Sequence, residues 1–185
     1  QKLTGIEEKL IPDPYFFGGG LHQIKKGGFL KVHADFNYHP QMKLDRRLNV
    51  LIYLNKGWKK NYGGNLELWD KDMKKCVKKI LPLFNTMVIF STNDFTNHGH
   101  PNPLKCPKDI SRKSIATYYF SKGRPISEVI KVKKKNTTFF KNRHGEKNDV
   151  YVKKEFFRNI LRNFVFYQNM KNLEKKYLRT GKSKK

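Results

Sequence analysis

Short apolar runs separated by turn residues dominate the chain from Leu21 to Phe120. The clearest run, residues 47–55, repeats with a period of two, which is typical of a β-strand. One face carries Leu48, Val50, Ile52 and Leu54, and the other carries Asn49, Leu51, Tyr53 and Asn55. Further strands are expected at residues 65–69, 76–81, 86–90 and 113–120. Together they predict a mainly β fold, a double-stranded β-helix of the jelly-roll or cupin-like type.

The pattern changes after Arg124-Pro125, and residues 131–148 are basic and rich in turn formers. Beyond them, apolar residues recur at steps of three and four: Phe156, Ile160, Leu161, Phe164, Tyr167, Met170, Leu173 and Tyr177. This spacing predicts an amphipathic C-terminal helix that ends near Gly181. The helix either packs on the sheet or binds a partner. We expect a domain at residues 1–125 with flanking helices, and a basic extension at residues 126–185 that packs on the same domain.

Charge is the most unusual feature of the composition. Lys and Arg number 40 against 15 Asp and Glu, which gives a formal net charge of +25 over 185 residues. Such a charge attracts polyanions, so nucleic acid is a candidate partner. The alternative is a general richness in lysine, because the lysines are scattered over almost every segment.

Nothing in the sequence indicates a membrane or a secreted protein. No apolar run approaches the roughly 20 residues that span a bilayer, and no secretory leader is visible. Cys76 and Cys106 lie far apart and match no metal-finger spacing. We expect a cytoplasmic protein without membrane association. Because the chain starts at Gln1 rather than Met, we also expect that residues precede it.

The strongest chemical signal is His33-Ala34-Asp35. Residues i and i+2 of a strand share a face, so the imidazole and the carboxylate point to the same place. Two histidines and one carboxylate with open positions are the ligand set of non-haem Fe(II) oxygenases. His98 would supply the third ligand from a neighbouring strand, and His100 is the alternative. Without a third ligand, the simpler interpretation of His33 and Asp35 is an ion pair on the surface.

A candidate anion anchor follows at the head of the last strand. Arg112 and Ser114 lie two positions apart and therefore share a face of an otherwise apolar, aromatic run. A guanidinium binds a carboxylate through two parallel hydrogen bonds, and a nearby hydroxyl adds a donor. The alternative is that Arg112 is one more solvated cation in a basic chain.

In this order the motifs resemble the prolyl-4-hydroxylase-like branch of the 2-oxoglutarate/Fe(II)-dependent dioxygenases. The likeness covers about Gly20 to Phe120. It includes the strands at residues 28–36 and 47–55, Trp58 with Gly63-Gly64-Asn65-Leu66, and Arg112-Lys113-Ser114-Ile115. The resemblance implies that His33, Asp35 and His98 hold Fe(II). It also implies that Arg112, Tyr53 and Ser114 hold 2-oxoglutarate, with ascorbate as a candidate reductant.

The resemblance also implies the reaction. The expected enzyme hydroxylates a C–H bond while 2-oxoglutarate and O₂ yield succinate and CO₂. The expected substrate is a prolyl residue of a peptide or protein, or an amino acid. Asn37, Tyr38, Arg47 and Trp58 are candidate substrate contacts, or else ordinary loop residues. An oxygenase acting on nucleic acid and a non-catalytic jelly-roll binding module are the alternatives.

Three departures from the family pattern concern the co-substrate pocket. His98 and Arg112 are 14 positions apart (112 − 98), which is longer than usual, and the segment between them contains several prolines. Certain relatives have a cofactor-binding tyrosine about ten positions before the first iron ligand, where this chain has His22 and Gln23. A tryptophan common in the last strand is Tyr118 here.

Overall fold

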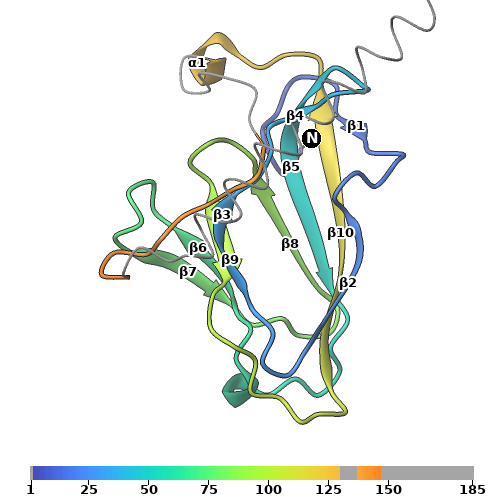
Figure 1. Ribbon diagram of the computed structural model, residues 1–185. Helices are drawn as coiled ribbons and strands as arrows, with labels where there is room; N and C mark the ends of the chain where they lie inside the picture. The colour runs from blue at the N-terminus through green and yellow to red at the C-terminus, as the bar shows by residue number, and fades with distance from the viewer. Residues whose placement is uncertain (1, 130–136, 147–185) are drawn as a thin grey trace, which may run out of the picture. The chain divides into compact units, whose positions relative to one another are not determined.

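Two antiparallel sheets face each other in the computed structural model, which describes residues 2–129 and 137–146 (Figure 1). The first sheet has the order β1 (Ile11–Pro12), β10 (Ser111–Ser121), β5 (Leu44–Tyr53), β4 (Tyr38–His39), with β2 (Gly20–Lys25) paired to β10 and β8 (Thr86–Ser91) paired to β5. The second has the order β11 (Phe139–Phe140), β3 (Leu30–Ala34), β9 (Asn97–His100), β6 (Leu66–Trp69), β7 (Cys76–Ile80).

The prediction of a mainly β jelly roll is confirmed. The strands expected at residues 65–69, 76–81, 86–90 and 113–120 correspond to β6, β7, β8 and β10. Helical structure in the described part of the chain is limited to η1 (Lys60–Tyr62) and α1 (Ile126–Val129), so the flanking helices there are short. None of the described helices is long and apolar enough to cross a membrane. The helix predicted between Phe156 and Tyr177 lies outside the described residues.

Strict alternation along β10 creates the inner face of the first sheet. Its even-numbered residues from 112 to 120 are buried, whereas the odd-numbered residues between them are exposed or half-buried. Ser114 pairs with Tyr53 of β5 and Ala116 pairs with Leu51, so the inward residues of the two strands form common rows. Tyr53 packs with Leu66 of the second sheet and so joins the two inner faces in one core cluster.

The segment at residues 137–146 belongs to the same compact unit, which spans Gln1–Lys147. Phe139 and Phe140 of β11 pair with Ala34 and His33 of β3. The amide of Lys141 donates a hydrogen bond to a β3 carbonyl at 2.8 Å and extends this pairing. The chain beyond the boundary expected at residue 125 therefore returns to the strand that carries His33.

Candidate metal centre and anion pocket

Three side chains meet between the two sheets. His33 lies on β3, Asp35 follows the end of that strand, and His98 lies on β9, opposite His33 in the strand register. One ligand atom from each residue lies within 4.8 Å of the other two. The three residues are only 6%, 9% and 7% exposed. This cluster does not include His100, so the geometry favours His98 as the third metal ligand.

The hydrogen bonds of the two imidazoles direct unprotonated nitrogens toward Asp35. His33 Nδ1 lies 2.8 Å from one backbone carbonyl oxygen, and His98 Nδ1 lies 3.1 Å from another. Because a carbonyl oxygen can only accept, each Nδ1 carries a proton, and Nε2 of the neutral ring presents a lone pair. Each Nε2 lies 3.4 Å from an oxygen of Asp35. Lone pairs and a carboxylate at this distance repel one another unless a cation lies between them, so the donor set fits Fe(II).

Both ligand types are in the protonation state that binds a metal. Burial by itself would raise the pKa of Asp35, but the positive charge of the Arg46 guanidinium opposes burial most strongly, and the pKa lies well below its usual value. Burial lowers the pKa of His98 to about 4, with Asp35 opposing the shift. The carboxylate is therefore ionised and the His98 ring neutral near pH 7, as metal binding requires.

Two donors on β5 orient the carboxylate. Arg46 Nη2 donates to Asp35 Oδ2 at 3.0 Å, and Asn49 Nδ2 donates to the same oxygen at 2.6 Å. Arg46 Nε donates in turn to Asn49 Oδ1 at 3.0 Å, so the two side chains support each other. Partners of this kind fix the orientation of a metal ligand and tune its basicity.

A bulge in β5 places both donors on one face. Arg46 and Asn49 are three positions apart and would lie on opposite faces of a regular strand. The register of β5 with β10 shifts at Arg47, because no residue of β10 lies opposite it. Arg46 therefore reaches the inner face. Its guanidinium lies 4.2 Å from the ring centroid of Phe36 and 3.4 Å from that of Tyr118. These contacts stabilise a cation that is fully buried.

A buried arginine on the inner face of β10 marks the second part of the candidate site, the anion pocket around Arg112, Tyr53 and Ser114. Arg112 is 5% exposed. Its Nε donates to the Gly64 carbonyl at 2.8 Å, and its Nη2 donates to the Tyr53 hydroxyl at 3.3 Å. Within residues 2–129 and 137–146, no carboxylate forms an ion pair with Arg112. Burial lowers the pKa of this guanidinium. Because a buried unpaired charge is costly, an anionic ligand would be strongly stabilised here.

Gly64 allows this arginine to approach the chain closely. The backbone φ angles are +72° at Gly63 and +71° at Gly64, in the left-handed region that favours glycine. A Cβ at Gly64 would lie 2.5 Å from Leu104 Cδ2 and 3.1 Å from Arg112 Cδ. Gly64, the second glycine of the motif, therefore makes room for Arg112 of β10, which belongs to the opposite sheet.

His22 and Gln23 of β2 stand where certain relatives have a cofactor-binding tyrosine. The two side chains lie on opposite faces of the strand. His22 pairs with Ser114 in the strand register and so shares the inner face, and burial and then the Arg112 charge lower its pKa. Gln23 Nε2 donates to Ser111 Oγ at 2.9 Å, on the outer face. His22 is therefore the residue of this pair that lies on the side of the anion pocket.

Three of the candidate substrate residues form structural contacts. Asn37 is 1% exposed and its amide donates to a carboxylate at 3.0 Å. Arg47 is 3% exposed, forms an ion pair with Glu8 at 3.0 Å and lines a separate cavity of about 350 Å³ that the triad does not line. Trp58 is 5% exposed and packs in the core. We propose no substrate contact through these three side chains. Tyr38 is half-buried on β4 and stays a prediction.

Comparison with known proteins identifies the family. A family model described as the 2OG-Fe(II) oxygenase superfamily matches residues 19–120, more than half of the chain. The mouse (Mus musculus) protein prolyl 3-hydroxylase OGFOD1 is 30% identical over 79 residues, which are 40% of this chain and 14% of that protein. The chain thus spans a small part of the length of this curated relative.

Solved structures of prolyl hydroxylases are also similar. A prolyl 4-hydroxylase from Phytophthora capsici is 24% identical, with 55% of this chain and 31% of that chain covered and a TM-score of 0.43. A prolyl hydroxylase from Trichoplax adhaerens, in complex with a hypoxia inducible factor oxygen degradation domain peptide fragment, is 24% identical, with 55% and 42% covered and a TM-score of 0.43. On the family match, the chain belongs to the 2OG-Fe(II) oxygenase superfamily, a membership that implies Fe(II) and 2-oxoglutarate.

Proposed function

We propose that this chain is a 2-oxoglutarate- and Fe(II)-dependent hydroxylase of prolyl residues in a peptide or protein. The observation that carries the proposal is the buried cluster of His33, Asp35 and His98, whose ligand atoms lie within 4.8 Å of one another. Arg112, a buried cation without a carboxylate partner among the described residues, supports the co-substrate assignment. The intact ligand set argues against a non-catalytic binding module.

The proposed roles of the residues rest on their positions in the site and on the family to which the chain belongs. His33, Asp35 and His98 would hold Fe(II), and Arg112, Tyr53 and Ser114 would hold the far carboxylate of 2-oxoglutarate. With O₂, the bound iron and keto acid supply an oxidant that hydroxylates a C–H bond, with succinate and CO₂ as the other products. Arg46 and Asn49 keep the Asp35 carboxylate oriented. The protein's own contribution is thus to position the reactants and to bury the site.

We choose a prolyl residue as the substrate because of the mouse relative that matches 79 residues of this chain. That mouse protein is named a prolyl 3-hydroxylase, and the 30% identity covers only 79 residues. The chemistry of the site itself would serve any C–H bond held beside the metal. Hydroxylation at any carbon of the proline ring is compatible with this chemistry, and so is hydroxylation of a free amino acid. Ascorbate stays a prediction as reductant.

A mass-resolved turnover assay tests this function. The protein is incubated with Fe(II), 2-oxoglutarate and O₂ together with a library of proline-containing peptides, and succinate is measured in parallel. We expect a gain of one oxygen on proline, in proportion to the succinate that depends on the peptide. Succinate formation without any oxygen gain in peptides or amino acids would contradict the prolyl assignment. Absence of succinate under all conditions would contradict the dioxygenase assignment.

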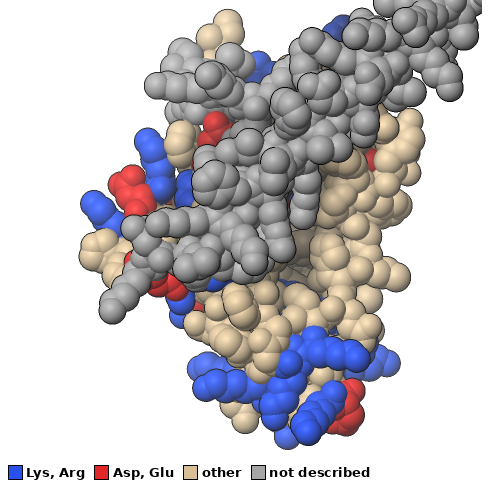
Figure 2. All heavy atoms as spheres, viewed as in Figure 1, with Lys and Arg blue, Asp and Glu red and all other residues tan. Residues whose placement is uncertain are grey.

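A second candidate is an oxygenase that acts on nucleic acid. The observation in its favour is the net charge of +25. Figure 2 shows lysine and arginine side chains gathered at the end of the molecule near η1. The exposed residues of this basic end include Lys59, Lys60, Lys105 and Lys108. The amide of Lys105 donates to the Tyr62 carbonyl at 2.9 Å, which joins two of the loops involved.

Salt dependence and substrate separate the two candidates. Oligonucleotide binding that weakens steeply with salt, together with oxidation of alkylated bases, would favour the nucleic-acid oxygenase. The double variant Lys105→Glu and Lys108→Glu should then lose this activity. If prolyl hydroxylation is the function, the same variant should retain turnover of a neutral peptide.

A further inference from the structure

His100 is a buried histidine for which the fold provides no hydrogen-bond partner. His100 is 3% exposed, and within the described part of the chain neither its Nδ1 nor its Nε2 has a hydrogen-bond partner. A neutral imidazole always carries one N–H donor and one lone pair, so the N–H of His100 has no acceptor among the described residues. Leaving a buried polar group unsatisfied costs about 1–3 kcal/mol. Such a residue indicates that a ligand or a water completes its environment.

The position of His100 on β9 directs it toward the anion pocket. It lies two positions after His98, so the two rings share the inner face of the strand. Two residues of a strand advance about 6–7 Å, which carries His100 past the metal cluster. In the register it pairs with Leu30, whereas His98 pairs with His33. His100 therefore lies on the side of His98 away from Asp35, the side on which β3 begins.

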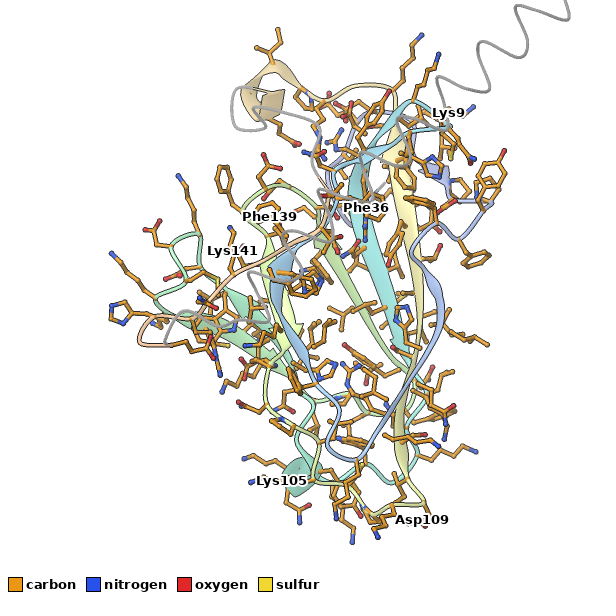
Figure 3. All side chains as sticks on the ribbon, viewed as in Figure 1. Lys9, Phe36, Lys105, Asp109, Phe139 and Lys141 are labelled. Atoms are coloured by element: carbon orange, nitrogen blue, oxygen red, sulfur yellow. The ribbon has the colours of Figure 1, made fainter. Side chains whose placement is uncertain are left out.

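The strand register brings His100 close to Arg112. Glu67 of β6 pairs with Gly99 of β9, so the residues that precede Glu67 run alongside His100. Gly64, three positions before Glu67, accepts a hydrogen bond from Arg112 Nε at 2.8 Å. Side chains fill the space between the sheets from the level of Phe36 down to the loop that contains Asp109 (Figure 3).

We propose that His100 donates a hydrogen bond to the far carboxylate of 2-oxoglutarate, together with Arg112 and Tyr53. This inference rests on the proposed function. One carboxylate would then supply both the counter-ion that Arg112 lacks among the described residues and the acceptor that His100 lacks. A carboxylate has about four lone-pair sites and can accept from several donors at once. His100 is therefore assigned to the recognition of the second carboxylate rather than to the metal.

The test compares two keto acids on the Mn(II)-loaded protein, which binds them without turnover. One is 2-oxoglutarate, and the other is 2-oxopentanoate, which has a methyl group in place of the second carboxylate. His100→Phe keeps a ring of similar size and removes both nitrogens. We expect the calorimetric affinity for 2-oxoglutarate to fall about 10- to 100-fold, as for a hydrogen bond to a charged group. The affinity for 2-oxopentanoate should change by less than about twofold, and so should that for Mn(II).

Conservative variants identify the donor atom. The side-chain amide of His100→Asn approximates Nδ1, and that of His100→Gln approximates Nε2. We expect one of the two to recover most of the affinity for 2-oxoglutarate. Lys113→Gln is the matched control, because Lys113 is an exposed cation next to Arg112 on the opposite face of β10. This control should bind both keto acids as the wild type does.

A measurement on the unaltered protein keeps the test independent of folding defects. With ¹⁵N-labelled histidine and Zn(II) in place of Mn(II), a ring N–H signal of His100 should become protected from exchange on addition of 2-oxoglutarate. It should stay unprotected with 2-oxopentanoate. Absence of this difference would overturn the inference.

Each other result has a defined meaning. An equal loss of both keto acids in His100→Phe would show that the residue only shapes the pocket. A loss of Mn(II) affinity would show that it acts at the metal. Either result would overturn the inference and leave the proposed function intact. If the Mn(II)-loaded wild type bound no 2-oxoglutarate, the proposed function itself would fail.

Discussion

The two ends of the pocket differ in whether the protein itself supplies hydrogen-bond partners for the groups that would face a ligand. At the metal end, Asp35 receives hydrogen bonds from Arg46 and Asn49, and the Nδ1 atoms of both triad histidines lie within hydrogen-bond distance of carbonyls. At the opposite end, Arg112 has no carboxylate and His100 no partner among the described residues. The first end is organised before any ligand binds, whereas the second is completed only by an anion.

This difference suggests how the site separates two tasks. Metal binding requires fixed ligand geometry, which the hydrogen bonds from Arg46 and Asn49 to Asp35 provide. Recognition of a co-substrate that binds and leaves requires groups whose hydrogen bonds are made by the ligand itself. Variants at the two ends should therefore fail in different ways, and the size of each failure should follow the number of contacts removed.

The largest effect is expected from loss of the carboxylate. Asp35→Ala should abolish succinate formation and reduce the affinity for Mn(II) more than about 100-fold, because the site loses its only anionic ligand and retains the buried cation Arg46. Calorimetry with Mn(II) measures this loss. The control Asp72→Ala removes an exposed carboxylate in the turn between β6 and β7 and should bind Mn(II) normally. Retained turnover in Asp35→Ala would exclude Asp35 as a ligand.

The next largest effect is expected at the anion end. Arg112→Gln should weaken the binding of 2-oxoglutarate about 100-fold, since truncating one partner of a buried charge pair costs about 2–5 kcal/mol. Binding of Mn(II) should be unchanged. A variant that lost metal and co-substrate in equal measure would contradict the separation of the two ends.

A smaller effect is expected from the hydrogen-bond network behind the metal. Asn49→Ala removes the 2.6 Å hydrogen bond to Asp35 and one acceptor for Arg46. We expect the affinity for Mn(II) to fall about tenfold, at the lower end of the range for residues that orient metal ligands. The affinity of the remaining metal-loaded protein for 2-oxoglutarate should stay the same. Unchanged metal affinity would show that Arg46 alone orients the carboxylate.

The smallest effect is expected from the tyrosine hydroxyl. Tyr53→Phe removes the 3.3 Å contact with Arg112 and keeps the ring in the core. A neutral hydrogen bond contributes about 0.5–1.5 kcal/mol, so the affinity for 2-oxoglutarate should fall about threefold. A calorimetric loss as large as that of Arg112→Gln would show that Tyr53 positions the arginine rather than assisting it.

The sequence predicted the residues that local rules govern. The period of two on strands put His33 with Asp35, and Arg112 with Ser114, and the structure retains both relations. It also predicted β5, β6, β7, β8 and β10, because turn residues separate these strands clearly. Asn49 was placed on the same face as Tyr53, but its contact with Asp35 joins two sheets and has no local signal.

The residues that were missed depend on departures from regular geometry. Arg46 reaches the inner face only through the bulge beside Arg47, and a single extra residue reverses the expected face. The sequence likewise gave no reason to expect that residues 139–140 would pair with β3. Asn37 and Trp58 lie in segments expected to be loops, and Arg47 lies where a loop was expected to meet a strand. The burial of all three follows from long-range packing that no local pattern encodes.

The central claim is that one divalent cation binds between the Nε2 atoms of His33 and His98 and the carboxylate of Asp35. Anomalous diffraction at the iron edge, from crystals grown without oxygen in the presence of Fe(II) and 2-oxoglutarate, tests it directly. We predict one peak among these three side chains, with the far carboxylate of the keto acid beside Arg112. A peak at another group of residues, or density for the keto acid without a metal among the three, would contradict the account.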